Sequence, residues 1–196
     1  MSYIKKQLKD YLARIEVAGD VALSIGAQHD DRQYFKRCEF KEWMTLDVNH
    51  DFNPTLCYDM NKPVMDEAGE PGVDFTYLEK FDYVFAFELW EYIYDPLTAH
   101  RNVYALLKPG GVYMGSYVFI YPHHNPVGKD YLRYTDWGIK RLLEAVGFRD
   151  IVITPRLATA GREDLARFVQ NEQMRLSREL AAAYDYPIGY IISAKK

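Results

Sequence analysis

Cysteine is scarce in this chain, and its scarcity excludes a scaffold held together by several disulfides. The two cysteines among the 196 residues, Cys38 and Cys57, lie 19 positions apart and form no Cys-x-x-Cys pair. No histidine stands near them at the spacing of a zinc ligand set, so the sequence predicts no metal site. We interpret both as reduced thiols in the core of a protein from a reducing compartment.

An excess of charge and long apolar runs are also missing. The chain has 24 basic and 28 acidic residues, a net charge of −4, which is too small and of the wrong sign for a nucleic-acid groove or an anionic membrane surface. No run of 18 apolar residues occurs, and the N-terminal stretch lacks the apolar region of a signal peptide. We therefore expect a soluble, cytoplasmic protein whose partner is a small molecule.

Short apolar segments alternate with amphipathic ones along the chain, which predicts a doubly wound, Rossmann-like α/β sheet. The hydrophobic content of 48% suits one core, so we expect a single domain over 1–196. The predicted strands are 21–25, 42–46, 55–58, 83–87, 112–120, 151–154 and 187–193. The predicted helices are 2–17, 96–107, 136–146 and 161–184, with a short helical crossover at 31–36 and a loop at 61–74.

The helix at 161–184 stands between the last two predicted strands, where a short hairpin would be enough to connect them. Its apolar residues spread over more than one face, which suits either a packed lid or a homodimer contact.

Several predicted strands end in residues that suit a nucleotide. In a doubly wound sheet ligands bind at the carboxyl ends of the strands, where Gly26, Asp47, Asp59 and Phe87 would all lie. Asp47 follows Gly26 by 21 residues, at the place where a carboxylate accepts both ribose hydroxyls in proteins that bind NAD or S-adenosylmethionine. Asp59 and Met60 suit an adenine, with the carboxylate facing the amine and the thioether packing on the ring. The alternatives are a solvated loop residue for Asp47 and an ordinary turn for Asp59.

A set of motifs in the second half of the chain supports a family resemblance. They are Phe81-Asp82 before a strand, Glu91 to Pro96, the Leu-Lys-Pro-Gly-Gly of 107–111, Asp130 to Thr135, and Leu142 to Phe148. Together they resemble the class I S-adenosylmethionine-dependent methyltransferases that act on small molecules and sugars, over about residues 20–154. The resemblance implies a seven-stranded sheet whose last strand is antiparallel, S-adenosylmethionine as cofactor, and methylation of a small hydroxylated or amine substrate.

The first glycine motif departs from that family. Where such enzymes have an acidic residue followed by Gly-x-Gly-x-Gly, this chain has Ser24 to Asp30 with Gly26 as its one glycine. The missing glycines normally let backbone amides approach the cofactor. The resemblance still places Gly26, Ala27 and Gln28 at the cofactor, with Gln28 or His29 adding polar contacts. The alternative is a binding or assembly protein that has lost the cofactor, and an NAD-dependent oxidoreductase is less favoured.

Three residues are candidates for catalysis. His124 matches a histidine of the resembling group and would act as a base, although it could instead hold its loop by hydrogen bonds. Asp130, three residues before Arg133, could orient a substrate or form a structural ion pair. Glu88 follows the fourth predicted strand and could contact the substrate or act as a cap.

Overall fold

A seven-stranded mixed sheet forms the centre of the protein. A computed structural model describes residues 3–26, 31–65, 75–121, 123, 128–157 and 187–196. The strands are β1 (Glu16–Ile25), β2 (Arg37–Asp47), β3 (Leu56–Cys57), β4 (Phe81–Ala86), β5 (Leu107–Val118), β6 (Arg149–Leu157) and β7 (Pro187–Lys195). Their order is β3-β2-β1-β4-β5-β7-β6, and β7 runs antiparallel to both neighbours. The predicted fold class is confirmed.

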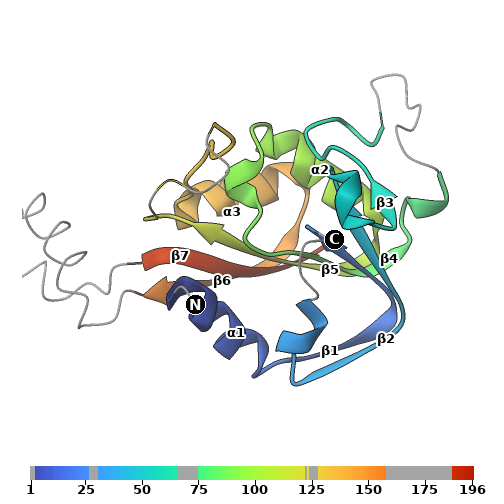
Figure 1. Cartoon of the computed structure of the whole chain (residues 1–196), viewed down its shortest axis with the longest axis horizontal. Coiled ribbons are helices and arrows are strands. Elements are labelled where there is room, and N and C mark those ends of the chain that lie inside the picture. Colours follow the sequence, from blue (N-terminus) through green and yellow to red (C-terminus); the bar gives the residue numbers. More distant parts are fainter. Residues whose placement is uncertain (1–2, 27–30, 66–74, 122, 124–127, 158–186) are drawn as a thin grey trace, which may run out of the picture.

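Helices cover the two faces of this sheet unequally (Figure 1). The helices α2 (Pro96–Leu106) and α3 (Asp136–Val146) lie on one face, and α1 (Tyr3–Leu12) lies on the other. Four short 3-10 helices complete the described elements: η1 (Asp31–Tyr34), η2 (His50–Phe52), η3 (Phe75–Tyr77) and η4 (Trp90–Tyr92). The described part of the crossover between β1 and β2 therefore holds a single 3-10 turn, close to the short helix predicted at 31–36.

The ends of α2 and α3 are set by local sequence, and here the prediction was accurate. The Asp95 carboxylate caps α2 by accepting from the Thr98 amide, while Thr135 caps α3 by accepting from the Gly138 amide. Gly147 ends α3 with a φ of +114°, a left-handed conformation that glycine adopts without steric cost.

Other boundaries differ from those predicted. The helix predicted at 2–17 ends at Leu12, because β1 already begins at Glu16 and pairs there with Arg37 of β2. The run of apolar residues predicted only the buried second half of β1, at 21–25. The first half alternates exposed and buried residues and has no such run. Cys57 is exposed on the edge strand β3, which corrects its assignment to the core, although neither Cys38 nor Cys57 forms a disulfide, as expected. The helix predicted at 161–184 lies outside the described residues.

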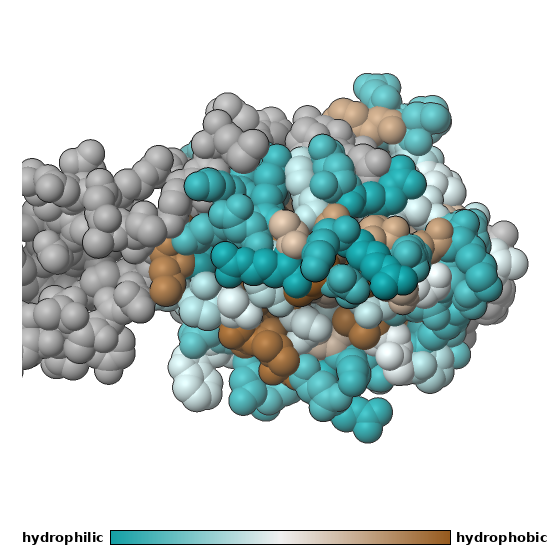
Figure 2. All heavy atoms as spheres, turned by 90° about the horizontal axis from the view of Figure 1, so that it is seen from below, coloured by the Kyte–Doolittle hydropathy of each residue, from teal (hydrophilic) through white to brown (hydrophobic). Residues whose placement is uncertain are grey.

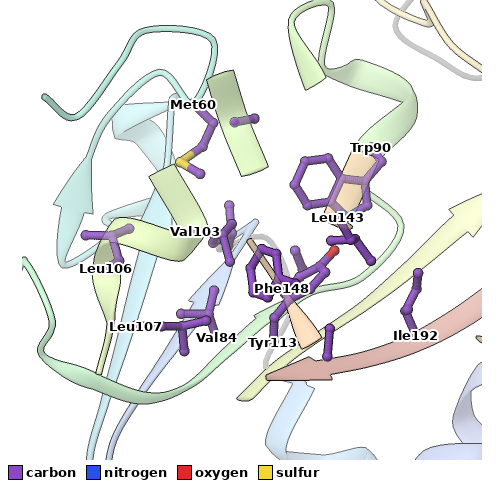
Figure 3. Packing of buried hydrophobic residues seen from close by; sticks show 14 of the residues in the cluster. Met60, Val84, Trp90, Val103, Leu106, Leu107, Tyr113, Leu143, Phe148 and Ile192 are labelled. Carbon is purple, nitrogen blue, oxygen red and sulfur yellow. The ribbon is translucent and has the colours of Figure 1, made fainter. Parts of the chain in front are cut away.

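The main core lies between the sheet and the helices α2 and α3. Figure 3 shows Met60, Val103, Leu143 and Phe148 within this one cluster. Trp90 is fully buried there, and its ring stacks on that of His100 with the centroids 3.8 Å apart. The loop after β4 is thus anchored in the core, and it leads directly into the candidate site.

The opposite face is covered largely by aromatic side chains. Phe85 of β4 stacks on Trp43 and Tyr83, with ring centroids 5.2 and 5.6 Å apart, and Phe35 after η1 packs at 5.2 Å. These rings bury apolar area that a crossover helix would otherwise cover. Figure 2, seen from the α1 side, shows hydrophobic residues between polar ones on this face.

The Phe-Asp and Lys-Pro-Gly-Gly motifs meet in space. Asp82 accepts hydrogen bonds from the amides of Asp20 and Val21, at 2.9 and 2.8 Å, and forms an ion pair of 2.8 Å with Lys108. One carboxylate therefore ties β4 to the middle of β1 and to the start of β5. No described helix is long and apolar enough to cross a membrane.

Candidate functional site

The candidate site lies where the strand order reverses. β1 pairs with β2 on one side and with β4 on the other, and Ser24 of β1 stands opposite Phe85 of β4. The carboxyl ends of β1 and β4 consequently lie next to each other, and Gly26 and Glu88 follow them. This is the switch point at which doubly wound sheets bind their ligands.

Gly26 has the backbone expected of a cofactor loop. Its φ is +98°, and a Cβ built on it would meet no described atom within 4 Å. The glycine is thus needed for its backbone conformation, and no described residue fills the space beside it. Ala27 and Gln28, also predicted to touch the cofactor, lie outside the described residues.

Two carboxylates follow at the ends of β2 and β3, as predicted. Asp47 accepts a hydrogen bond of 2.8 Å from the Asn49 amide. Asp59 accepts from the amide and from the side chain of Asn61, at 3.0 and 2.9 Å. Both carboxylates are held in place by local turns, and both side chains are partly exposed.

Met60 and Phe87 are less accessible than the cofactor prediction requires. Met60 is 4% exposed and belongs to the main core, as Figure 3 shows, so little of its thioether is available to an adenine ring. Phe87 is 9% exposed and packs 6.0 Å from Phe85 in the aromatic cluster. Each would offer at most an edge to a ligand.

The segment before α3 folds over the loop after β4. The Glu91 carbonyl accepts from the Tyr131 amide at 2.7 Å, and the Trp90 carbonyl accepts from the Tyr134 hydroxyl at 3.0 Å. Two motifs separated by about 40 positions, Glu91 to Pro96 and Asp130 to Thr135, are thereby joined into one wall of the site.

Asp130 lies inside that wall as half of an ion pair. Its side chain is 3% exposed and accepts two hydrogen bonds from Arg133, at 2.5 and 2.7 Å, in bidentate geometry. Arg133 also donates to the Tyr121 carbonyl at 3.3 Å. This arrangement closes the loop, so it matches the structural alternative for Asp130 and gives Arg133 the more accessible position. His124 lies outside the described residues.

Glu88 is held by a network that the sequence did not predict. Its Oε1 accepts from Ser116 Oγ at 2.8 Å and from Arg156 Nη1 at 2.7 Å, and its amide donates to Ser116 Oγ. Glu88 has a φ of +51°, which is uncommon for a residue with a Cβ and is often found at functional sites. Arg156 stands two residues beyond the strand predicted at 151–154, so no sequence signal pointed to it.

Arg156 of β6 reaches Glu88, at the end of β4, across the two intervening strands β7 and β5. Its side chain is 1% exposed and also donates to the Tyr117 carbonyl at 2.9 Å. A Cβ at Gly189 of β7 would lie 2.8 Å from Arg156 Nη2 and 2.4 Å from the Tyr117 carbonyl oxygen. Gly189 therefore leaves room for the arginine to lie against the sheet.

Comparisons with known proteins identify the fold. No family model and no curated protein matches the chain. Among solved structures, an S-adenosylmethionine-dependent methyltransferase from Mesorhizobium loti is 14% identical with a TM-score of 0.62, and the match covers 100% of this chain and 99% of that one. One from Archaeoglobus fulgidus is 16% identical with a TM-score of 0.57, over 98% and 93%. This chain has the class I methyltransferase fold.

A larger protein shares that methyltransferase fold. Phosphoethanolamine N-methyltransferase 2 of Haemonchus contortus, solved with S-adenosyl-L-methionine, is 15% identical with a TM-score of 0.57. The match covers 97% of this chain and 52% of that protein, so this chain spans about half its length. At such identities the likeness is one of fold.

Within this methyltransferase fold, Glu91 is a buried acid with an altered pKa. It is 1% exposed, and burial, together with the nearby charges of Glu88 and Asp130, raises its pKa to about 7. Burial and the Glu91 charge also raise the pKa of Tyr92 to about 12. The wall of the site thus contains a carboxyl group that changes charge near neutral pH.

Glu91→Gln is expected to stabilise the protein at pH 8. The folded-state pKa of Glu91 is raised, so the penalty for ionising it is absent below its unfolded pKa and grows as the pH rises through about 7. The stability gain of the neutral variant over wild type, measured as unfolding free energy, should be about 2–3 kcal/mol larger at pH 8 than at pH 4.5. Urea unfolding at both pH values measures this gain. Glu144→Gln, on the exposed side of α3, is the control, and an equal response of both variants would contradict the assignment.

Proposed function

We propose that the protein transfers a methyl group from S-adenosylmethionine to a small hydroxylated or amine acceptor. The observation that carries this proposal is the pair of left-handed residues Gly26 and Glu88, which follow adjacent strands at the switch point of a methyltransferase fold. No described atom lies within 4 Å of a Cβ built on the first, and the carboxylate of the second lies 2.7 Å from Arg156 Nη1. Its structural neighbours carry the names of enzymes of this chemistry.

The described residues fit such a cofactor. The Gly26 backbone would lie against its amino-acid end, and Asp47 would accept the ribose hydroxyls. Asp59 would face the adenine amine, with Phe87 and Met60 contributing edges only. Ala27 and Gln28 remain predictions for the same loop.

The chain's own residues would bind and orient the acceptor. When bound, the cofactor supplies a sulfonium methyl group: the acceptor lone pair forms the bond to carbon, and sulfur keeps the electron pair of the broken bond. Orientation provides much of the rate of such a displacement. Glu88 and Arg133 would position the acceptor, Asp130 would hold Arg133, and His124 would take the proton.

Asp47→Asn is expected to weaken binding of S-adenosylhomocysteine by roughly tenfold to a hundredfold, since hydrogen bonds to a charged group contribute about 1.5–3 kcal/mol. Isothermal titration calorimetry measures this difference. Asp51→Asn, in the exposed turn four residues later, is the matched control. Equal affinities of the two variants would remove Asp47 from the site.

The glycine-poor first loop favours one alternative, a binding or assembly protein without cofactor. The same titration decides between the two. No heat and no thermal shift at millimolar S-adenosylhomocysteine would support the alternative, and binding of NADH in its place would indicate an oxidoreductase.

A further inference from the structure

The two oxygens of Glu88 have different surroundings. Oε1 accepts both the Ser116 hydroxyl and the Arg156 guanidinium. Oε2 accepts no hydrogen bond from any part of the chain that the structure describes, and the side chain remains 16% exposed. Oε1 is thus anchored, whereas Oε2 has no donor among the described residues.

The anchoring comes from three strands. Glu88 follows β4, Ser116 lies on β5 and Arg156 lies on β6. The φ of +51° at Glu88 is held by the hydrogen bond of 2.8 Å that its backbone N–H donates to Ser116 Oγ. A strained residue persists where surrounding contacts determine its conformation, and such residues cluster at ligand sites. Arg156 pairs with this carboxylate at 2.7 Å, and its own side chain is 1% exposed.

The charges around Glu88 favour a basic ligand. The described charged groups near this oxygen are the carboxyl groups of Glu91 and Asp130 and the guanidinium groups of Arg133 and Arg156, with the exposed His123 ring 3.7 Å from Asp130. Both guanidinium groups are already bonded to carboxylates, so an anionic acceptor would meet Glu88 Oε2 with like charge.

We propose that Glu88 Oε2 binds the nitrogen of an amine acceptor beside the transferred methyl group, with Arg156 and Ser116 as positioning residues that fix this oxygen. This inference rests on the proposed function and narrows its acceptor to an amine. Glu88 is then the group that touches the substrate. Arg156 acts through Glu88, and Gly189 provides the space for it.

Sinefungin tests this proposal without knowledge of the natural substrate. It is an analogue of S-adenosylmethionine in which a carbon bearing an amino group replaces the methylated sulfur, so its amine lies where the methyl group would be transferred. S-adenosylhomocysteine lacks that amine. The ratio of the two dissociation constants therefore measures the effect of a carboxylate beside the transferred methyl group. Changes elsewhere in the site alter both dissociation constants alike and leave the ratio unchanged.

We expect wild-type protein to bind sinefungin at least about tenfold more tightly than S-adenosylhomocysteine at pH 8, the size of a charge-assisted hydrogen bond. Glu88→Gln should bring the ratio close to one. Ser116→Ala and Arg156→Lys should lower it partly, because each keeps the Glu88 charge but loosens its position. Glu144→Gln should retain the wild-type ratio. Thermal unfolding establishes that each variant is folded, and the wild-type ratio itself needs no variant.

The outcomes separate this proposal from the proposed function. A wild-type ratio near one, or a ratio unchanged in Glu88→Gln, with S-adenosylhomocysteine still bound, overturns the role of Glu88 and leaves the cofactor proposal standing. Failure of both nucleosides to bind wild-type protein removes the proposed function, and the role of Glu88 falls with it.

Discussion

Replacing Arg156 with methionine is expected to lower the free energy of unfolding by about 3–5 kcal/mol, because removing one partner of a buried ion pair leaves the other charge uncompensated. Arg156 is 1% exposed and binds both Glu88 and the Tyr117 carbonyl, so two acceptors lose their donor. Methionine fills much of the arginine stem without replacing either bond. Urea unfolding at pH 7 measures the loss.

A second variant separates charge from packing. In Glu88→Gln/Arg156→Met no charge remains, so we expect the double variant to be more stable than Arg156→Met alone. Arg149→Met, on the exposed end of the same strand, should change stability by less than about 0.5 kcal/mol. The role given to Arg156 is wrong if its substitution costs no more than that of Arg149.

This network also shows which parts of the fold the sequence could reveal. The ends of α2 and α3 depend on Asp95, Thr135 and Gly147, residues within four positions of the groups they cap, so local pattern was sufficient. Arg156 acts on Glu88 from 68 positions away in the sequence, across β7 and β5. No local pattern contains that contact, and only the strand order brings the two residues together.

The candidate site likewise has residues that the sequence could predict and others that it could not. Gly26, Asp47 and Asp59 were predicted because each follows a strand, and the sheet places all three at its carboxyl edge. Met60 follows a strand too, but the sequence could not show that its side chain turns into the core. The local sequence around Met60 is the same whether its side chain faces the site or the core. Its burial depends on packing with α2, which lies some forty positions later.

His100 is the second group whose removal is expected to have a large effect. It is fully buried on α2, where its Nδ1–H donates to the Pro96 carbonyl at 2.6 Å and its Nε2 accepts from the Tyr117 hydroxyl at 2.5 Å. Because the Pro96 carbonyl can only accept, the neutral ring has a single suitable tautomer. Burial lowers the pKa of His100 to about 4, so the folded protein resists its protonation.

The sign of the pH dependence follows from that lowered pKa. The stabilising contribution of neutral His100 is complete above its unfolded pKa, near 6.5, and is lost as the pH falls through the folded value of about 4, a total of about 3 kcal/mol. Glu91 acts in the opposite direction between its folded pKa of about 7 and its ordinary pKa of 4.5. Across the shared range the two contributions nearly cancel in the wild-type protein.

Single variants should therefore reveal slopes of opposite sign. Glu91→Gln leaves His100 alone, so its unfolding free energy should fall by about 1.4 kcal/mol per pH unit between pH 6.5 and 4.5, relative to the double variant Glu91→Gln/His100→Gln. His100→Gln leaves Glu91 alone and should become more stable over the same range. His50→Gln, on an exposed residue, should follow the wild type. Parallel curves of unfolding free energy against pH for all four variants would mean that neither buried group changes its protonation on folding. The pH dependence of stability in acid would then come from the surface carboxylates.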